Sequence, residues 1–180
     1  MKIRRALTLA IVVASVGVLA VATFANLSPK AKAPNFTLPT LEGKSLTLSD
    51  HTKGSPRAVV LDIWATWCPP CRAEIPYLVD LYNGYKDKGL VMIGVAIDQE
   101  KADVKEFAKQ QKISYTLALD PGAETIGSKY KVTGIPATYV IDKKGVVRYV
   151  HSGFPTRSKD EQQKEAKQIE NEVKTLLAEK

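Results

Sequence analysis

The chain has 180 residues, of which 44% are hydrophobic and 25% are charged, a balance typical of one globular domain with short appendages. Its formal net charge is +7, but Lys2, Arg4 and Arg5 precede an uncharged stretch, which leaves 23 of the 26 basic residues and all 19 acidic residues in 26–180. No basic run alternates with aromatic residues, so we do not predict nucleic-acid binding.

The uncharged stretch covers residues 6–25. Twenty helical residues span about 30 Å, the thickness of a bilayer's hydrocarbon core. The basic residues ahead of this stretch favour a cytoplasmic N-terminus and an exported body. We therefore predict a signal anchor over residues 1–25, a linker over 26–34 and a domain over 35–180. A cleaved signal peptide is the alternative, because Ala20-Val21-Ala22 offers a small-x-small cleavage site.

Beyond the linker, the apolar pattern switches between short buried runs and amphipathic helical periods. Strand–helix–strand units in the middle imply parallel pairing, and a late hairpin adds antiparallel strands, so the predicted sheet is mixed and flanked by helices. The predicted strands are 36–38, 46–48, 58–65, 90–97, 115–119, 138–141 and 146–150, and the predicted helices are 69–88, 99–111, 123–130 and 159–178.

The only two cysteines, Cys68 and Cys71, are separated by two prolines. A disulfide between them would close almost no loop, so it would add little stability. In an exported domain, such a pair is better explained as a catalyst of thiol exchange. A zinc site would need two more ligands from His51 and His151, whose spacing does not fit, so we predict no metal. We predict no cofactor either, since no flavin or nicotinamide motif appears.

Cys68 follows a buried strand and precedes a helix, so it should lie at the helix N-terminus, where the helix dipole stabilises a thiolate. Cys68 would attack a substrate disulfide, and Cys71, one turn inside, would resolve the mixed disulfide. Pro69 and Pro70 have no amide hydrogen to donate to the thiolate. We therefore expect a reductant, with a potential nearer that of thioredoxin (about −270 mV) than of a strong periplasmic oxidant (about −120 mV).

Two motifs resemble the signatures of the thioredoxin superfamily. The first runs from Val60 to Cys71, with Pro76 five residues further on, and the second is Gly134-Ile135-Pro136-Ala137-Thr138. The segments 33–39 and 139–145 are similar to the TlpA/ResA-like branch, which comprises membrane-anchored or exported bacterial thiol-disulfide oxidoreductases.

This resemblance covers about residues 33–155 and implies an α/β, thioredoxin-like fold with an N-terminal β extension and a central insertion. It also implies that the Ile135–Pro136 peptide is cis and faces Cys68, where Ile135 and Pro136 would offer main-chain groups to an extended substrate. Trp67 is the expected surface platform for that substrate.

The resemblance also draws attention to four acidic residues, of which Asp62 is the candidate for proton exchange with Cys71. Asp62 matches the buried acid of thioredoxins, and a carboxyl in an apolar strand should have a raised pKa; the alternative is a buried polar group without that role. Asp98 or Glu100 is a candidate for the acid that this branch takes from its central insertion, or for a helix cap. Glu74 matches the acid of CxxCxxE sequences in this branch, but on a helix we expect it to be solvated.

The leading hypothesis is a membrane-anchored reductase of disulfides in extracytoplasmic proteins, with apocytochrome c as a candidate substrate. Its catalytic domain would lie on the periplasmic side of a bacterial membrane, and a transmembrane thiol donor would supply its electrons.

The sequence leaves three alternatives open. A disulfide oxidase or isomerase is disfavoured because no long helical insertion separates Cys71 from Pro136. A thiol peroxidase is disfavoured because the residue three before Cys68 is Ala65 rather than threonine. A metal-delivery chaperone would use the two thiols with His151 as a further ligand.

Overall fold

The computed structural model describes residues 27–52 and 58–179. The predicted anchor over 1–25 therefore lies outside the described residues. Within the two described ranges, no helix is both long and apolar enough to cross a bilayer.

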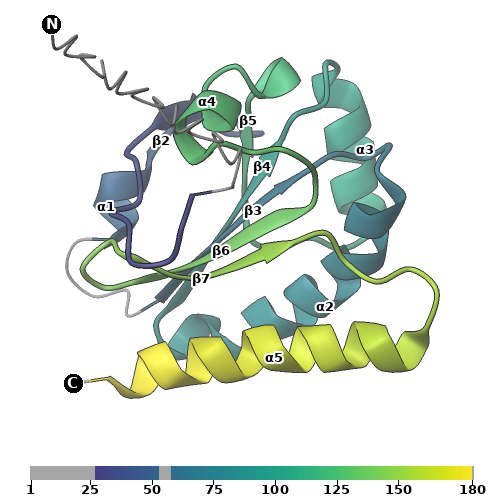
Figure 1. Ribbon diagram of the computed structural model, residues 1–180. Helices are drawn as coiled ribbons and strands as arrows, with labels where there is room; N and C mark the ends of the chain where they lie inside the picture. The colour runs from purple at the N-terminus through teal and green to yellow at the C-terminus, as the bar shows by residue number, and fades with distance from the viewer. Residues whose placement is uncertain (1–26, 53–57, 180) are drawn as a thin grey trace, which may run out of the picture.

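A five-stranded mixed sheet forms the centre of the domain, with the strand order β5-β4-β3-β6-β7 (Figure 1). β3 pairs in parallel with β4, and β4 with β5, whereas β6 and β7 join by antiparallel pairing. This arrangement confirms the predicted α/β, thioredoxin-like fold. The strands are β3 (Ala58–Trp64), β4 (Leu90–Ala96), β5 (Thr116–Leu119), β6 (Ala137–Asp142) and β7 (Val147–Ser152).

Helices cover both faces of the sheet. Every residue of β3 is therefore buried, and its side chains alternate between two apolar layers. Val60 and Trp64 pack in the layer under α2, α3 and α5, and Leu61 and Ile63 pack in the layer under α1 and α4 (Figure 1). The helices are α1 (Leu48–Thr52), α2 (Pro69–Tyr85), α3 (Lys101–Gln110), α4 (Ile126–Tyr130) and α5 (Lys159–Ala178).

The N-terminal β extension is a two-stranded antiparallel sheet of β1 (Thr37–Pro39) and β2 (Ser45–Thr47). The predicted second strand includes residue 48, but the chain turns into the short helix α1 there. Asn35 accounts for this difference, because its Oδ1 accepts a hydrogen bond of 2.9 Å from the amide of Ser49 in the first turn of α1.

The helix after the cysteines begins at Pro69 as predicted and continues beyond α2 as a 3₁₀ turn, Lys86–Lys88. Gly89 ends it with φ +99°, a conformation that glycine adopts without a Cβ penalty. The predicted helix over 123–130 is instead a 3₁₀ turn, Pro121–Ala123, followed by α4. The carboxylate of Asp120 accepts from the amides of Thr125 and Ile126, so it caps the second piece.

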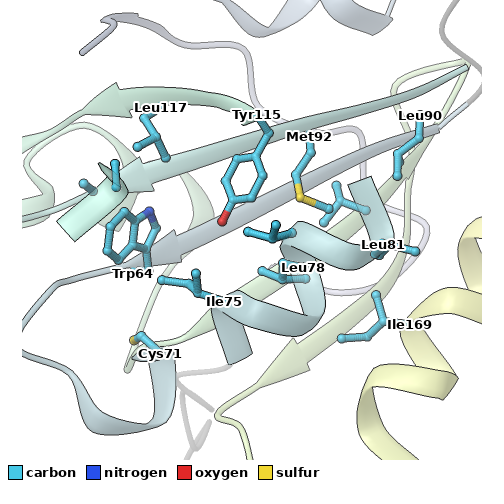
Figure 2. Packing of buried hydrophobic residues seen from close by; sticks show 14 of the residues in the cluster. Trp64, Cys71, Ile75, Leu78, Leu81, Leu90, Met92, Tyr115, Leu117 and Ile169 are labelled. Atoms are coloured by element: carbon cyan, nitrogen blue, oxygen red, sulfur yellow. The ribbon is translucent and has the colours of Figure 1, made fainter. Parts of the chain in front are cut away.

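The layer under α2 contains large side chains that meet over Gly94 of β4. Figure 2 shows Trp64, Tyr115 and Leu117 there, with Ile75 and Leu78 of α2 facing them. A Cβ on Gly94 would lie 2.8 Å from Leu117 Cδ2 and 2.9 Å from Trp64 Nε1. The missing side chain of Gly94 therefore makes room for the indole ring at the end of the strand that carries Asp62.

We expect Gly94→Ala to lower the free energy of unfolding by about 1–3 kcal/mol, the usual cost of overpacking a core. Gly84→Ala is the matched control, because a Cβ at Gly84 meets no atom within 4 Å and alanine favours a helix by about 0.5–1 kcal/mol. Urea unfolding of the oxidised variants measures both. Equal stability of the two variants would contradict the packing described for Gly94.

Candidate active site

Cys68 and Cys71 form a disulfide at the junction between β3 and α2. Cys68 is the N-cap residue of α2, and its Sγ accepts a hydrogen bond of 3.2 Å from the amide of Cys71. Both cysteines are buried. The same amide would stabilise a Cys68 thiolate after reduction, since helix N-termini favour negative charge.

The loop before β6 faces the disulfide. The Ile135–Pro136 peptide is cis, and the carbonyl oxygen of Ile135 lies 3.7 Å from Cys68 Sγ. Pro136 is buried and its carbonyl accepts from the amide of Gly153, whereas Ile135 is half-buried. Trp67, the residue directly before Cys68, is 64% exposed, so its apolar ring stands in solvent.

The loop that leads into Cys68 is held by Asp98. Its buried carboxylate accepts from the amide of Thr66 at 3.1 and 3.2 Å, and the hydroxyl of Thr66 donates to it as well. Asp98 therefore fixes the approach to the disulfide rather than capping a helix. Glu100 stands at the N-cap position of α3, is exposed, and makes no capping hydrogen bond with its side chain.

Arg72 supports the same loop from the first turns of α2. Its guanidinium donates to the carbonyl of Thr66 at 3.5 Å and lies 5.4 Å from the ring centroid of Phe107. A positive charge is thereby held close to the N-terminus of α2, where it adds to the field that favours a thiolate.

Asp62 and Glu74 form a buried acid pair, and each is only 1% exposed. The prediction that Glu74 is solvated is wrong. Glu74 lies three residues after Cys71, on the stripe of α2 that also buries Ile75 and Leu78. This i, i+3, i+4, i+7 spacing is visible in the sequence and is the signal for burial.

One hydroxyl joins the two acids. Thr138 Oγ1 lies 2.9 Å from Glu74 Oε1 and 3.4 Å from Asp62 Oδ1, and Thr138 is the ladder partner of Asp62 in β6. A threonine hydroxyl has a single hydrogen, so it donates to one carboxylate and accepts from the other only if that one is protonated. The geometry therefore favours a pair that holds at least one proton.

Burial is the main reason why both acids are weak. It raises the pKa of Asp62 to about 7, although the hydrogen bond from Thr138 opposes the shift. Burial also raises the pKa of Glu74 well above its usual range, and the negative charges of Asp62 and Glu165 raise it further. Among the described residues, neither Asp62 Oδ2 nor Glu74 Oε2 has a hydrogen-bond partner. Their environment thus disfavours two ionised carboxylates and favours a pair that retains a proton.

His151 does not approach the cysteines as a free ligand. Its two ring nitrogens each lie 2.7 Å from a carboxylate oxygen, of Glu165 and of Glu172. Within the described ranges, no group of three or more histidine, cysteine or acidic side chains is arranged to hold a metal ion.

A disulfide at a helix N-terminus, opposite a cis-proline loop on a five-stranded mixed sheet, defines a thioredoxin-fold oxidoreductase. Comparison with known proteins supports this class. The family model described as AhpC/TSA matches residues 29–150. A candidate thiol:disulfide interchange protein DsbE from Chlorobium tepidum has a similar structure, with a TM-score of 0.73, 31% identity, and coverage of 84% of this chain and 99% of that one.

The sequence relatives are more specific. The chain is 42% identical over 116 residues to a thiol-disulfide oxidoreductase ResA from Bacillus cereus, a match that covers 64% of this chain and 65% of that protein, just under two thirds. It is 40% identical over 131 residues to ResA from Bacillus thuringiensis subsp. konkukian, covering 73% of each chain. The chain therefore belongs to the AhpC/TSA family and, within it, to the ResA-like thiol-disulfide oxidoreductases. The predicted resemblance is confirmed, and Cys68 and Cys71 are the redox pair.

The raised pKa of Asp62 has a defined effect on stability. Its ordinary pKa is 3.8 and its pKa in the folded protein is about 7, so between these values the folded state binds more protons than the unfolded state. Stability therefore falls as pH rises from about 4 to above 7. We expect Asp62→Asn to raise the free energy of unfolding at pH 8 by about 1–3 kcal/mol, since a charge no longer has to be buried.

Urea unfolding of the oxidised protein at pH 5 and pH 8 tests this expectation. The difference between the two pH values should be smaller in Asp62→Asn than in the unchanged protein. Asp87→Asn, at an exposed position, is the control and should leave the difference as it is. An undiminished pH dependence in Asp62→Asn would show that Asp62 is not a buried acid of raised pKa.

Proposed function

We propose that the chain is an exported, membrane-anchored reductase of disulfides in extracytoplasmic proteins. Residues 1–25 would be the anchor, and the domain would lie on the periplasmic side of a bacterial membrane. The names of the relatives support thiol-disulfide exchange. The family model matches only from residue 29, so the proposed anchor rests on its apolar length and its basic flank.

The observation that carries the direction of the reaction is the set of amides around Cys68. Positions N2 and N3 of a helix are the usual donors to the N-cap side chain. Here N3 is Cys71, which donates to Cys68 Sγ, and N2 is Pro70, which has no hydrogen to donate. A thiolate with fewer donors is less stable, so the reduced form gives up its electrons more readily.

The proposed reaction uses the two cysteines in turn. The Cys68 thiolate attacks a substrate disulfide and forms a mixed disulfide while one substrate thiolate leaves. Cys71 then loses its thiol proton to the carboxyl pair of Asp62 and Glu74 and attacks Cys68, which releases the second substrate thiolate. The leaving thiolates take protons from solvent. A transmembrane thiol donor would then reduce the disulfide again.

Substrate contact is proposed for Trp67, Ile135 and Pro136. The exposed ring of Trp67 and the half-buried Ile135 flank Cys68 and offer apolar surface to an unfolded or extended chain. The oxidised cysteines of apocytochrome c are the candidate target, because such a protein presents a disulfide in an unfolded segment.

The reduction potential of the Cys68–Cys71 pair tests the proposed direction. Full-length protein in detergent, equilibrated against dithiothreitol or glutathione buffers, should give a value near or below about −230 mV. A value above about −180 mV would contradict the reductase and favour an oxidase or isomerase.

Two proline variants test the reason for that potential. Pro70→Ala restores an amide at N2, and one charge-assisted hydrogen bond of about 1.5–3 kcal/mol should raise the potential by roughly 30–60 mV. Pro69→Ala restores an amide at N1, which is not a usual donor to the N-cap side chain, so its potential should change little. Equal shifts in both variants would show that the missing N2 donor is not the cause.

A further inference from the structure

A row of paired residues crosses the face of the sheet that α2 and α5 cover. Asp62 of β3 pairs with Gly94 of β4 and with Thr138 of β6, and Thr138 pairs with His151 of β7. Directly paired residues of neighbouring strands project to the same face. The row therefore contains Asp62, Thr138 and His151 in a layer whose neighbouring side chains are mostly apolar, as Figure 2 illustrates for Trp64 and Tyr115.

His151 forms the outer end of this row. Its side chain is 6% exposed, with Nδ1 2.7 Å from Glu165 Oε1 and Nε2 2.7 Å from Glu172 Oε2. Carboxylates only accept hydrogen bonds, so a ring bonded to two of them carries a hydrogen on both nitrogens. The carboxylates raise the pKa of His151, although burial alone would lower it. A buried imidazolium therefore lies between two acids of α5.

The Thr138–His151 ladder pairing places this cluster beside the acid pair, and Glu165 acts on that pair through its charge. Its negative charge raises the pKa of Glu74, and Thr138 joins Glu74 to Asp62. Glu165 is also 29% exposed, whereas Glu74 is only 1% exposed. His151 and Glu165 thus form a charged pair separated from Asp62 by one strand, and His151 lies next to Thr138 in the ladder.

The groups that face this network come from several elements. Glu172 of α5 bonds His151 and accepts from Gln168, and Tyr149 of β7 packs against the same apolar layer. The ring of Tyr115 lies against Gly94 at the other end of the row. Burial raises the pKa of the Tyr115 hydroxyl, and the charges of Asp62 and Glu74 raise it further.

We propose that His151 and Glu165 are positioning residues for thiol-disulfide exchange, whose paired charges set the pH at which Asp62 and Glu74 take up and release the proton exchanged with Cys71. This inference deepens the proposed function and rests on its proton step. When Cys71 attacks the mixed disulfide, the bond between Cys68 and the substrate breaks, the Cys68–Cys71 bond forms, and the thiol proton moves to the carboxyl pair. When the donor reduces the disulfide, the pair returns that proton to the Cys71 thiolate.

The test is the pH dependence of the reduction potential of the full-length protein. The slope of the reduction potential against pH changes at the pH where a group linked to the redox pair titrates. If Asp62→Asn shifts the pH of one such slope change, that slope change is assigned to the acid pair. His151→Gln leaves Glu165 and Glu172 uncompensated, so the change should move to higher pH by about one unit, as expected for a nearby charge. Glu165→Gln removes a negative charge and should move it to lower pH.

The double variant His151→Gln/Glu165→Gln loses both charges. The pH of its slope change should therefore lie between those of the single variants, close to that of the unchanged protein. A purely structural role predicts instead that the double variant is the most disturbed. Glu170→Gln is the matched control: it is the same substitution on the same helix, and its partners are Lys167, Lys174 and Tyr85 rather than His151. Its slope change should stay in place.

Each outcome has a distinct meaning. If His151→Gln does not fold, Glu165→Gln decides alone, because glutamine keeps an acceptor for His151 at a partly exposed position. The inference is overturned if the two single variants shift the pH of the slope change in the same direction, or if neither shifts it. If Asp62→Asn leaves the pH of every slope change unaltered, the result contradicts the proton step of the proposed function itself. The value of the potential in the unchanged protein tests the reductase separately.

Discussion

Two buried carboxyls that share one threonine hydroxyl are the constraint on which this active site depends. Asp62 and Glu74 come from different elements, β3 and α2, and both lie inside an apolar layer. Two ionised carboxylates in such a layer would be unfavourable, and Thr138 has only one hydrogen to offer. The arrangement is stable when the pair holds a proton, and Glu74 lies one turn from Cys71 on the same helix.

The two cysteines depend on different parts of this structure. Cys68 is buried against the cis-proline loop, and the N-terminus of α2 and the Thr66 loop set its environment. Asp98 keeps that loop in place through both the amide and the hydroxyl of Thr66. Cys71 lies one turn inside, on the same stripe of α2 as Glu74. In the proposed reaction, attack on the substrate thus falls to the cysteine beside the cis-proline loop, and proton exchange to the cysteine on the buried stripe of α2.

Local patterns are sufficient to predict much of the fold. The last helix is predicted at 159–178 and observed at Lys159–Ala178, because Ser158 caps it and its apolar stripe is regular. The 3₁₀ turn that follows α2 ends at Gly89, and this end is equally predictable from the sequence, since a glycine follows the last helical residues. The short helix α1 is not predicted, because the acceptor at its start is Asn35, fourteen residues before Ser49.

The site is harder to predict, because its chemistry comes from contacts between distant segments. The cysteines, Asp62 and Pro136 stand in recognisable motifs, but the bond from Thr138 to Glu74 joins residues 64 positions apart. The burial of Glu74 is nevertheless predictable from the sequence, since its spacing from Cys71 places it on the buried stripe of α2. The carboxylates around His151 come from a helix after β7, and no motif indicates that they meet the ring.

The most direct test of the shared proton is the infrared difference spectrum between the oxidised and reduced full-length protein near neutral pH. A protonated carboxylic acid has a carbonyl band that a carboxylate lacks, and the band should change when the disulfide is reduced. We expect this redox-sensitive band to be lost or shifted in both Asp62→Asn and Glu74→Gln. A spectrum without such a band, or a band that is unaltered in both variants, would contradict a proton held between Asp62 and Glu74.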